Sequence, residues 1–327
     1  MRSCVIVLTL AAVAASPLLR RGLFHPFVAG QSLPASGWNA EHSPPLQAVL
    51  DTAVRTVVNR FAARGLRADQ VAATLVDLRD ETRPSMASVR GDVRIYPASV
   101  VKLFYLAAAE RWIEDGRLAA DAEFMRALHD MIVDSSNDAT AYVLDALTET
   151  SSGPPLGGPE MAAWSERRNV VNRYFASLGY RNINVNHKTW CEGPYGRDQV
   201  FLGPNRENRN ALTTDATARL LAEIVTGRAV TPARSSEMRA LLARDRTKRS
   251  ADPDDQATGF SGSGLPPGAK LWSKAGWTSN VRHDAAYVEL PSGARIILVT
   301  FTTEHSDQRD IVPAVVRAVI ERLRQSV

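Results

Sequence analysis

The sequence predicts a mixed α/β (α+β) fold, in which a five-stranded antiparallel sheet is flanked by terminal helices and carries an inserted all-helical subdomain. Three observations predict this fold. Apolar side chains recur at helical spacing in residues 44–63 and again in residues 311–324. Two strand-like stretches follow the first of these helices and three precede the second. Between the two sets of strands, residues 99–245 are mainly helical in pattern.

The strands are expected at residues 71–78, 86–95, 269–275, 284–290 and 294–302. Links of hairpin length join the last three strands, which therefore run antiparallel. The helical stretches are expected at residues 99–113, 119–133, 139–147, 164–178, 214–226 and 235–242. Two irregular segments, residues 151–159 and 181–210, interrupt them, and a loop as long as the second is typically functional or disordered.

This order divides the chain into a leader and one domain. Residues 4–19 form an apolar run after Arg2, which predicts a secretory signal peptide within residues 1–30 or an uncleaved membrane anchor. Residues 31–327 are expected to form one domain, with a sheet part (40–98 and 246–327) and a helical part (99–245). We therefore expect a periplasmic or secreted protein, without an intrachain disulfide because the mature chain keeps only Cys191.

Composition excludes several classes of function. The net charge is only +4 and no cluster of Lys and Arg contains interleaved aromatic residues, so no nucleic-acid partner is expected. The six His residues show no metal-ligand spacing, and no metal or organic cofactor is implied. We expect a monomer that acts on a small-molecule substrate. The chain has 34 Arg but only five Lys, which suggests that Lys is kept where a base is needed, since Arg does not lose its proton.

Residues 96–102 (YPASVVK) mark the passage from a strand to a buried helix. Pro97 favours a break in the strand, so Ser99 falls in the first helical turn, where free backbone N–H groups favour negative charge. Lys102 lies one turn on, in an apolar setting that lowers the pKa of an amine. Ser-x-x-Lys is a weak pattern by itself, and an N-cap serine with a surface lysine is the alternative.

Two further motifs strengthen the first. Residues 131–140 (MIVDSSNDAT) place Ser135 and Asn137 at the start of a helix, and residues 271–276 (LWSKAG) place Lys274 and Gly276 on a strand. If each motif is considered by itself, Ser135 is interpreted as a helix cap and Lys274 as a solvent-facing lysine beside a glycine bulge. The three motifs together, in this order, resemble the set found in class A β-lactamases and penicillin-binding proteins.

The resemblance covers roughly residues 46–323 and implies the serine β-lactamase/D,D-peptidase fold and a role for each catalytic residue. Ser99 attacks a carbonyl and becomes acylated, and Lys102 is the base or one step of a proton relay. Ser135 passes a proton to the leaving nitrogen. Lys274 adds positive potential near Ser135 and the substrate carboxylate.

The resemblance also implies substrate-binding residues. Asn137 hydrogen-bonds Lys102 and the side-chain amide of the substrate. Gly276 belongs to the strand motif, and the backbone N–H groups of Ser99 and Trp277 form the oxyanion hole, in which one donor is worth roughly 100- to 1,000-fold in rate.

Four departures from the family pattern limit what is implied. Ser136 stands where an acidic residue is common, and the stretch between Lys102 and Ser135 is short. Ala275 lacks the usual hydroxyl; Thr278, Ser279 or Arg282 could replace it, and Arg282 is the first choice because it grips a carboxylate in a bidentate manner. Glu192 is the candidate for the acid that activates the deacylating water, with a solvated loop residue as the alternative.

The function predicted is hydrolysis of β-lactam amides through an acyl-serine. A D,D-peptidase or esterase acting on peptidoglycan-like peptides or esters is the first alternative. A penicilloyl-binding or sensor module without turnover is the second, kept open by Ala275 and by the uncertain deacylation base. Cys191 is interpreted as a buried, inert thiol in preference to a reactive one.

Overall fold

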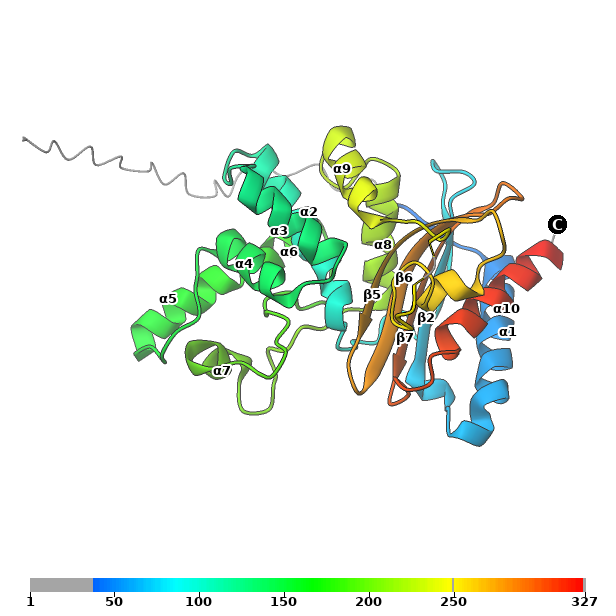
Figure 1. Cartoon of the computed structure of the whole chain (residues 1–327), viewed down its shortest axis with the longest axis horizontal. Helices are drawn as coiled ribbons and strands as arrows, with labels where there is room; N and C mark the ends of the chain where they lie inside the picture. The colour runs from blue at the N-terminus through cyan, green and yellow to red at the C-terminus, as the bar shows by residue number, and fades with distance from the viewer. Residues whose placement is uncertain (1–37, 249, 326–327) are drawn as a thin grey trace, which may run out of the picture. The chain divides into compact units, whose positions relative to one another are not determined.

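The computed structural model describes residues 38–248 and 250–325, so the predicted leader lies outside the described residues (Figure 1). Within this range the strands form one sheet in the order β1-β3-β2-β7-β6-β5-β4. The strands are β1 (Glu41–His42), β2 (Val71–Asp77), β3 (Ser85–Val89), β4 (Ala243–Arg244), β5 (Lys270–Trp277), β6 (Val281–Glu289) and β7 (Arg295–Thr303). The five longer strands pair antiparallel, as the sequence predicts.

The predicted strand count is corrected from five to seven in the described part. The two additional strands, β1 and β4, have two residues each and pair at the two edges of the sheet. β1 runs parallel to β3, so the sheet is not antiparallel throughout. Two residues are too few to show an alternating pattern, which is why the sequence did not reveal these strands.

The α-helices are α1 (Pro44–Phe61), α2 (Lys102–Glu114), α3 (Ala122–Ile132), α4 (Asn137–Thr148), α5 (Gly158–Arg168), α6 (Val170–Ser177), α7 (Gly196–Leu202), α8 (Thr214–Val225), α9 (Pro232–Leu242) and α10 (Ile311–Gln325). Short 3₁₀ helices are η1 (Ala62–Arg64), η2 (Ala68–Gln70), η3 (Ala98–Val101) and η4 (Phe260–Gly264). None of the helices in the described range is long and apolar enough to cross a membrane.

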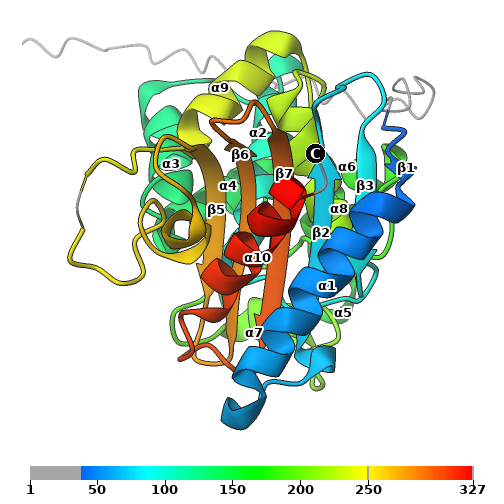
Figure 2. The same ribbon diagram turned by 90° about the vertical axis from the view of Figure 1, so that its right-hand side faces the viewer.

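Helices cover both faces of the sheet. α1 and α10 lie side by side on one face, as predicted (Figure 2). α8 packs against β2, β6 and β7 on the other face, while α9 contacts β5 and η3 contacts β5 and β6. Local sequence sets where α1 begins, because Ser43 Oγ accepts a hydrogen bond from Leu46 N and prolines occupy the first turn.

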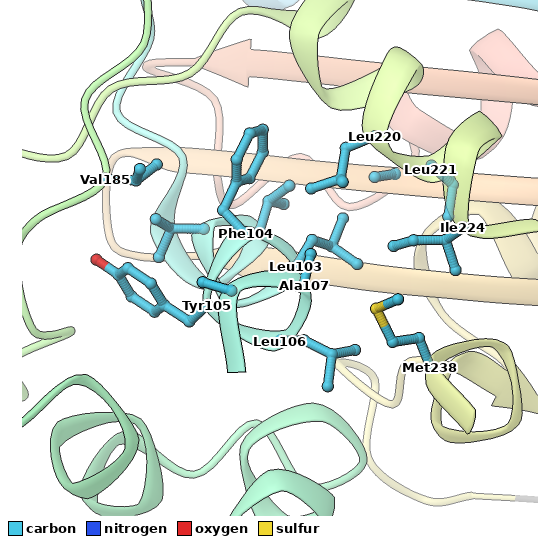
Figure 3. Close-up of a cluster of buried hydrophobic side chains, with 14 of the residues drawn as sticks. Leu103, Phe104, Tyr105, Leu106, Ala107, Val185, Leu220, Leu221, Ile224 and Met238 are labelled. Carbon is cyan, nitrogen blue, oxygen red and sulfur yellow. The ribbon is translucent and has the colours of Figure 1, made fainter. Parts of the chain in front are cut away.

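α2 runs through the centre of the helical part and is buried on all sides. Leu103 and Leu106 pack among Leu220 and Ile224 of α8 and Met238 of α9 (Figure 3). A helix that is apolar all round is a core helix, and each such side chain stabilises the fold by roughly 1.5–3 kcal/mol. The start of α2 is therefore held rigidly, and this is where the first motif lies.

Some predicted boundaries differ from the structure. The strand expected at residues 86–95 ends at Val89, because Arg90 adopts a left-handed conformation with φ 54°. The helix expected at residues 164–178 is two helices, α5 and α6, which meet at Asn169. The long segment 181–210 contains α7. The irregular backbone conformations at Arg90 and Asn169 are local, and the spacing of apolar residues does not predict them.

Candidate active site

Ser99 lies in η3, immediately before α2. Its neighbour Ala98 has φ 46°, a conformation that costs a residue with a side chain about 1–3 kcal/mol and that is typical of functional sites. The side chain of Ser99 is partly exposed and makes no hydrogen bond with any described residue. Val100 and Val101 are fully buried and anchor the turn. The hydroxyl of Ser99 is thus free and accessible on a fixed backbone.

Lys102 is fully buried and points its amine at the second motif. Nζ donates to Ser135 O at 2.6 Å, to Asn137 Oδ1 at 2.9 Å and to Ser135 Oγ at 3.2 Å. Burial lowers the pKa of Lys102 to about 7, and an electrostatic interaction with Cys191 opposes this shift. An amine with a pKa near neutrality can accept and return a proton at physiological pH.

Ser135 occupies the turn between α3 and α4 with a left-handed backbone, φ 58°. It does not cap α4. Ser136 is the N-cap, since its Oγ accepts a hydrogen bond from Ala139 N. The side chain of Ser135 is therefore free of helix capping and contacts both amines of the site. Asn137 is the first residue of α4, and its Nδ2 donates to Cys191 Sγ at 3.4 Å.

Lys274 lies on β5 and is fully buried. Its Nζ donates to Ser135 Oγ, Gln256 Oε1 and Ala275 O, each at 2.9 Å. Burial lowers the pKa of Lys274 well below its ordinary value, and the positive charges of Lys102 and Arg244 lower it further. Three acceptors surround this amine, so its ammonium form is fully hydrogen-bonded.

Gly276 brings β5 against the start of α2. A Cβ atom at this position would lie 2.7 Å from Ser99 N and 2.8 Å from Pro97 O, so only glycine fits. Trp277 follows, and its ring packs on Phe260 with the ring centroids 5.4 Å apart. The predicted role of Trp277 concerns its backbone N–H, which is next to the point of closest approach to Ser99.

Arg282 does not join these residues. It pairs with Trp277 in the β5–β6 register, three residues from Lys274, and therefore lies on the opposite face of the sheet. Only 2% of Arg282 is exposed; its Nη1 lies 2.7 Å from Asp254 Oδ1 and its guanidinium lies over the ring of Phe260. The structure thus corrects the expectation that Arg282 faces a substrate carboxylate from within the cluster.

The segment that follows α6 brings Cys191, and not Glu192, to the cluster. Cys191 is exposed, which corrects the expectation of a buried thiol. Glu192 is also exposed and forms no ion pair or side-chain hydrogen bond within the described range. Across residues 38–248 and 250–325, neither Lys102 nor Lys274 forms an ion pair with a carboxylate. The amines are held by neutral groups.

Gln256 is a residue of the cluster that the sequence did not indicate. It comes from the irregular segment between β4 and β5 and contacts Lys274 directly. A cavity of about 510 Å³ adjoins the cluster at Ser135, Trp277 and Gln256 and extends along Arg244. Its size is within the range of small-molecule sites.

A metal site is not part of this cluster. The group of potential ligands found within the described residues is His129, Asp130 and Asp134, near the end of α3. Asp130 already pairs with Arg126 and His129. These exposed side chains fit a solvated ion-pair network.

The model of the β-lactamase enzyme family matches residues 50–323. No curated protein matches the chain.

Solved structures show the same fold. A β-lactamase from Sphaerobacter thermophilus DSM 20745 is 20% identical with a TM-score of 0.58, and the match covers 85% of this chain and 97% of that one. A variant of the class A β-lactamase of the last common ancestor of Gram-negative bacteria is 19% identical with a TM-score of 0.61, covering 86% and 100%. A mutant of PBP-A, solved as an acyl-enzyme complex with penicillin G, is 17% identical with a TM-score of 0.59, covering 84% and 97%.

Proposed function

The chain belongs to the β-lactamase enzyme family, and on this premise we propose that it is a serine hydrolase that opens β-lactam amides through an acyl-enzyme on Ser99. One observation carries the proposal. The amines of Lys102 and Lys274 both contact Ser135 Oγ, at 3.2 and 2.9 Å, at the point where β5 meets the turn that holds Ser99. Three segments that are distant in the sequence supply these groups. If each motif had only a separate structural role, the groups would have no reason to meet at one point.

The proposed acylation moves one proton around this cluster. Neutral Lys102 accepts the proton of Ser99 while Ser99 Oγ bonds to the lactam carbonyl carbon. The C–N bond then breaks, Ser135 donates its proton to the leaving nitrogen, and Lys102 returns a proton to Ser135. Lys274 stabilises the alkoxide character of Ser135 during this transfer. The backbone N–H groups of Ser99 and Trp277 are the proposed donors to the carbonyl oxygen.

Deacylation distinguishes the two outcomes that this site allows. Water must attack the Ser99 ester, and a carboxylate base near the ester accelerates this step in hydrolases of this kind. Within the described residues, the hydrogen-bond acceptors around Lys102 are neutral groups, and Glu192 forms no ion pair or side-chain hydrogen bond with the cluster. This supports a second candidate function, a penicillin-binding protein with a persistent acyl-enzyme, such as the complex formed by the PBP-A mutant with penicillin G.

A chromogenic cephalosporin assay and intact-mass measurement test the proposal together. Turnover with a Ser99-dependent mass adduct supports the hydrolase, and a stable adduct without turnover supports the second candidate. Ser99→Ala is expected to abolish both signals. Ser292→Ala, which changes an exposed serine in the β6–β7 turn, is the matched control and is expected to retain them. Hydrolysis that persists in Ser99→Ala contradicts the acyl-serine mechanism.

A further inference from the structure

Gln256 reaches the candidate site from the irregular segment that links β4 to β5. It is 8% exposed and uses both ends of its amide. Oε1 accepts from Lys274 Nζ at 2.9 Å and from Ala275 N at 3.1 Å. Nε2 donates to Val133 O at 2.9 Å and to Ile132 O at 3.4 Å. Arg244 Nη2 is a third donor to Oε1, at 3.5 Å. Three donors face the oxygen and two carbonyls face the nitrogen, so only one orientation of the amide satisfies the network.

These contacts complete the open edge of β5. β4 pairs only with Leu271 and Trp272, so the part of β5 that carries Lys274 has no neighbouring strand on this side. Two side chains replace the missing strand: Arg244 donates to Ser273 O at 2.7 Å, and Gln256 accepts from Ala275 N. The end of β5 that approaches Ser99 is therefore fixed on this edge by side chains.

The same amide ties β5 to the turn that holds Ser135. Its two partners are the backbone carbonyls of Ile132, the last residue of α3, and of Val133, which lie three and two positions before Ser135. Gln256 thus bridges the strand of Lys274 and the turn of Ser135, beside Arg244, which joins Ser273 O of the same strand to Ile132 O. No other described side chain hydrogen-bonds both Lys274 and this turn while remaining outside the three motifs.

The charge of this side chain also matters. The charged groups that act on Lys274 are Lys102 from α2, Arg244 from β4 and Asp284 from β6. Gln256 supplies an acceptor to the ammonium without adding negative charge. A carboxylate at this position would raise the pKa of Lys274, because an opposite charge in contact raises the pKa of an amine by about 1–3 units. It would also offset the positive charge of Lys274, so that the protonated form of Lys102 would be repelled less.

We propose that Gln256 is a positioning residue for acylation: its amide holds the ammonium of Lys274 on the hydroxyl of Ser135 and fixes the end of β5 beside Ser99. The inference has two parts. The role of Gln256 in acylation rests on the proposed function, whereas its role in placing Lys274 rests only on the contacts of Gln256. The two parts can be measured separately.

The first experiment follows acylation of Ser99 by a β-lactam across pH in the full chain. Gln256→Met keeps the length of the side chain but removes its hydrogen bonds, and is expected to lower the acylation rate about 10- to 100-fold. Gln256→Glu is expected to move the pH midpoint of acylation up by about one unit. Gln199→Glu, an exposed glutamine of α7, is the control for added charge and is expected to match the wild type.

The second experiment does not depend on activity. With only five lysines in the chain, ¹³Cε-lysine labelling allows each amine to be titrated by NMR. Gln256→Glu is expected to raise the titration midpoint of Lys274 by at least about one unit relative to wild type and Gln199→Glu. Unchanged titration together with unchanged acylation in both Gln256 variants overturns the inference. A wild type that no β-lactam acylates refutes the proposed function and leaves the titration to decide the placement of Lys274.

Discussion

The hydroxyl oxygen of Ser135 lies 2.9 Å from Nζ of Lys274. The same oxygen lies 3.2 Å from Nζ of Lys102, so one hydroxyl connects two buried amines. Two ammonium groups on one oxygen repel each other, and burial penalises both, which favours loss of one proton. Burial lowers the pKa of Lys102 to about 7 and that of Lys274 well below its ordinary value, so the pair can lose this proton near neutral pH. The proposed mechanism assigns the neutral amine to Lys102, which lies one turn from Ser99.

Ser135→Ala tests the hydroxyl between the two amines. We expect the acylation rate to fall roughly 100- to 10,000-fold, because the leaving nitrogen loses its proton donor. Ser136→Ala is the control: it removes the N-cap of α4 and is expected to lower the free energy of unfolding by about 1 kcal/mol with a much smaller effect on acylation. Stopped-flow acylation and thermal denaturation measure both effects. Equal rates for the two variants would contradict the relay.

The residues that the sequence could identify are those set by local geometry. The start of a buried helix places Ser99 and Lys102 on one side of the same turn, and strand alternation places Lys274 toward the helical part. The helix and strand order and the fold class are confirmed, because long amphipathic segments carry a strong periodic signal. Their meeting at Ser135 followed from the family resemblance and not from periodicity.

The residues that the sequence missed depend on irregular chain. Gln256 and Cys191 lie in segments without a period, and nothing in their local sequence indicates that they reach β5 or α4. Arg282 was expected at the cluster because its charge suits a carboxylate. The β5–β6 register instead places it with Trp277, where Asp254 neutralises it. Register over a long-range strand pair cannot be read from composition.

Lys102→Arg tests whether the amine acts as a base. The wild-type acylation rate is expected to rise with pH and to level off above a midpoint near 7, since the neutral amine is the reactive form. Arg keeps its proton in proteins, so the variant is expected to acylate roughly 100- to 10,000-fold more slowly and to lose this pH dependence. Acylation by a β-lactam between pH 5.5 and 9, followed by intact mass, gives both profiles. If Lys102→Arg retains the pH midpoint of acylation near 7, the titration that controls acylation belongs to another group.

Gly276→Ala tests the close approach of β5 to Ser99. The added Cβ would meet backbone atoms of Ser99 and Pro97, which cannot move as a flexible side chain does. We expect a loss of about 1–3 kcal/mol of stability and a slower acylation reaction. Gly158→Ala, where a Cβ meets no atom within 4 Å, is the control and is expected to leave both unchanged or slightly improve stability. Chemical denaturation and acylation kinetics provide the comparison, and a fully active Gly276→Ala would show that the approach is not required.

Arg282→Ala tests whether Arg282 binds substrate. Its guanidinium is buried against Asp254 and Phe260, so its removal is expected to lower stability by roughly 2–4 kcal/mol. The ratio of acylation rates for a β-lactam carboxylate and its methyl ester is expected to stay the same, because Arg282 lies on the other face of the sheet from Lys274. A selective loss of the carboxylate substrate would restore the role expected from the sequence.

Lys102→Met tests the cost of burying the amine. Lys102 has a pKa of about 7 in the folded protein and an ordinary value of 10.5 once exposed, so between these values the unfolded chain binds more protons than the folded one. Wild-type stability therefore falls as the pH drops from about 10.5 to about 7. Below pH 7 this group lowers the stability no further. The variant lacks this dependence. Its free energy of unfolding is expected to improve relative to wild type across that window by an amount on the order of 3 kcal/mol.

Urea denaturation at pH 10 and pH 7 measures the difference, with Lys248→Met, an exposed lysine, as the control that should show none. A difference between variant and wild type that stays constant with pH would mean that Lys102 keeps its ordinary pKa in the folded protein, and would remove the reason to treat it as the base.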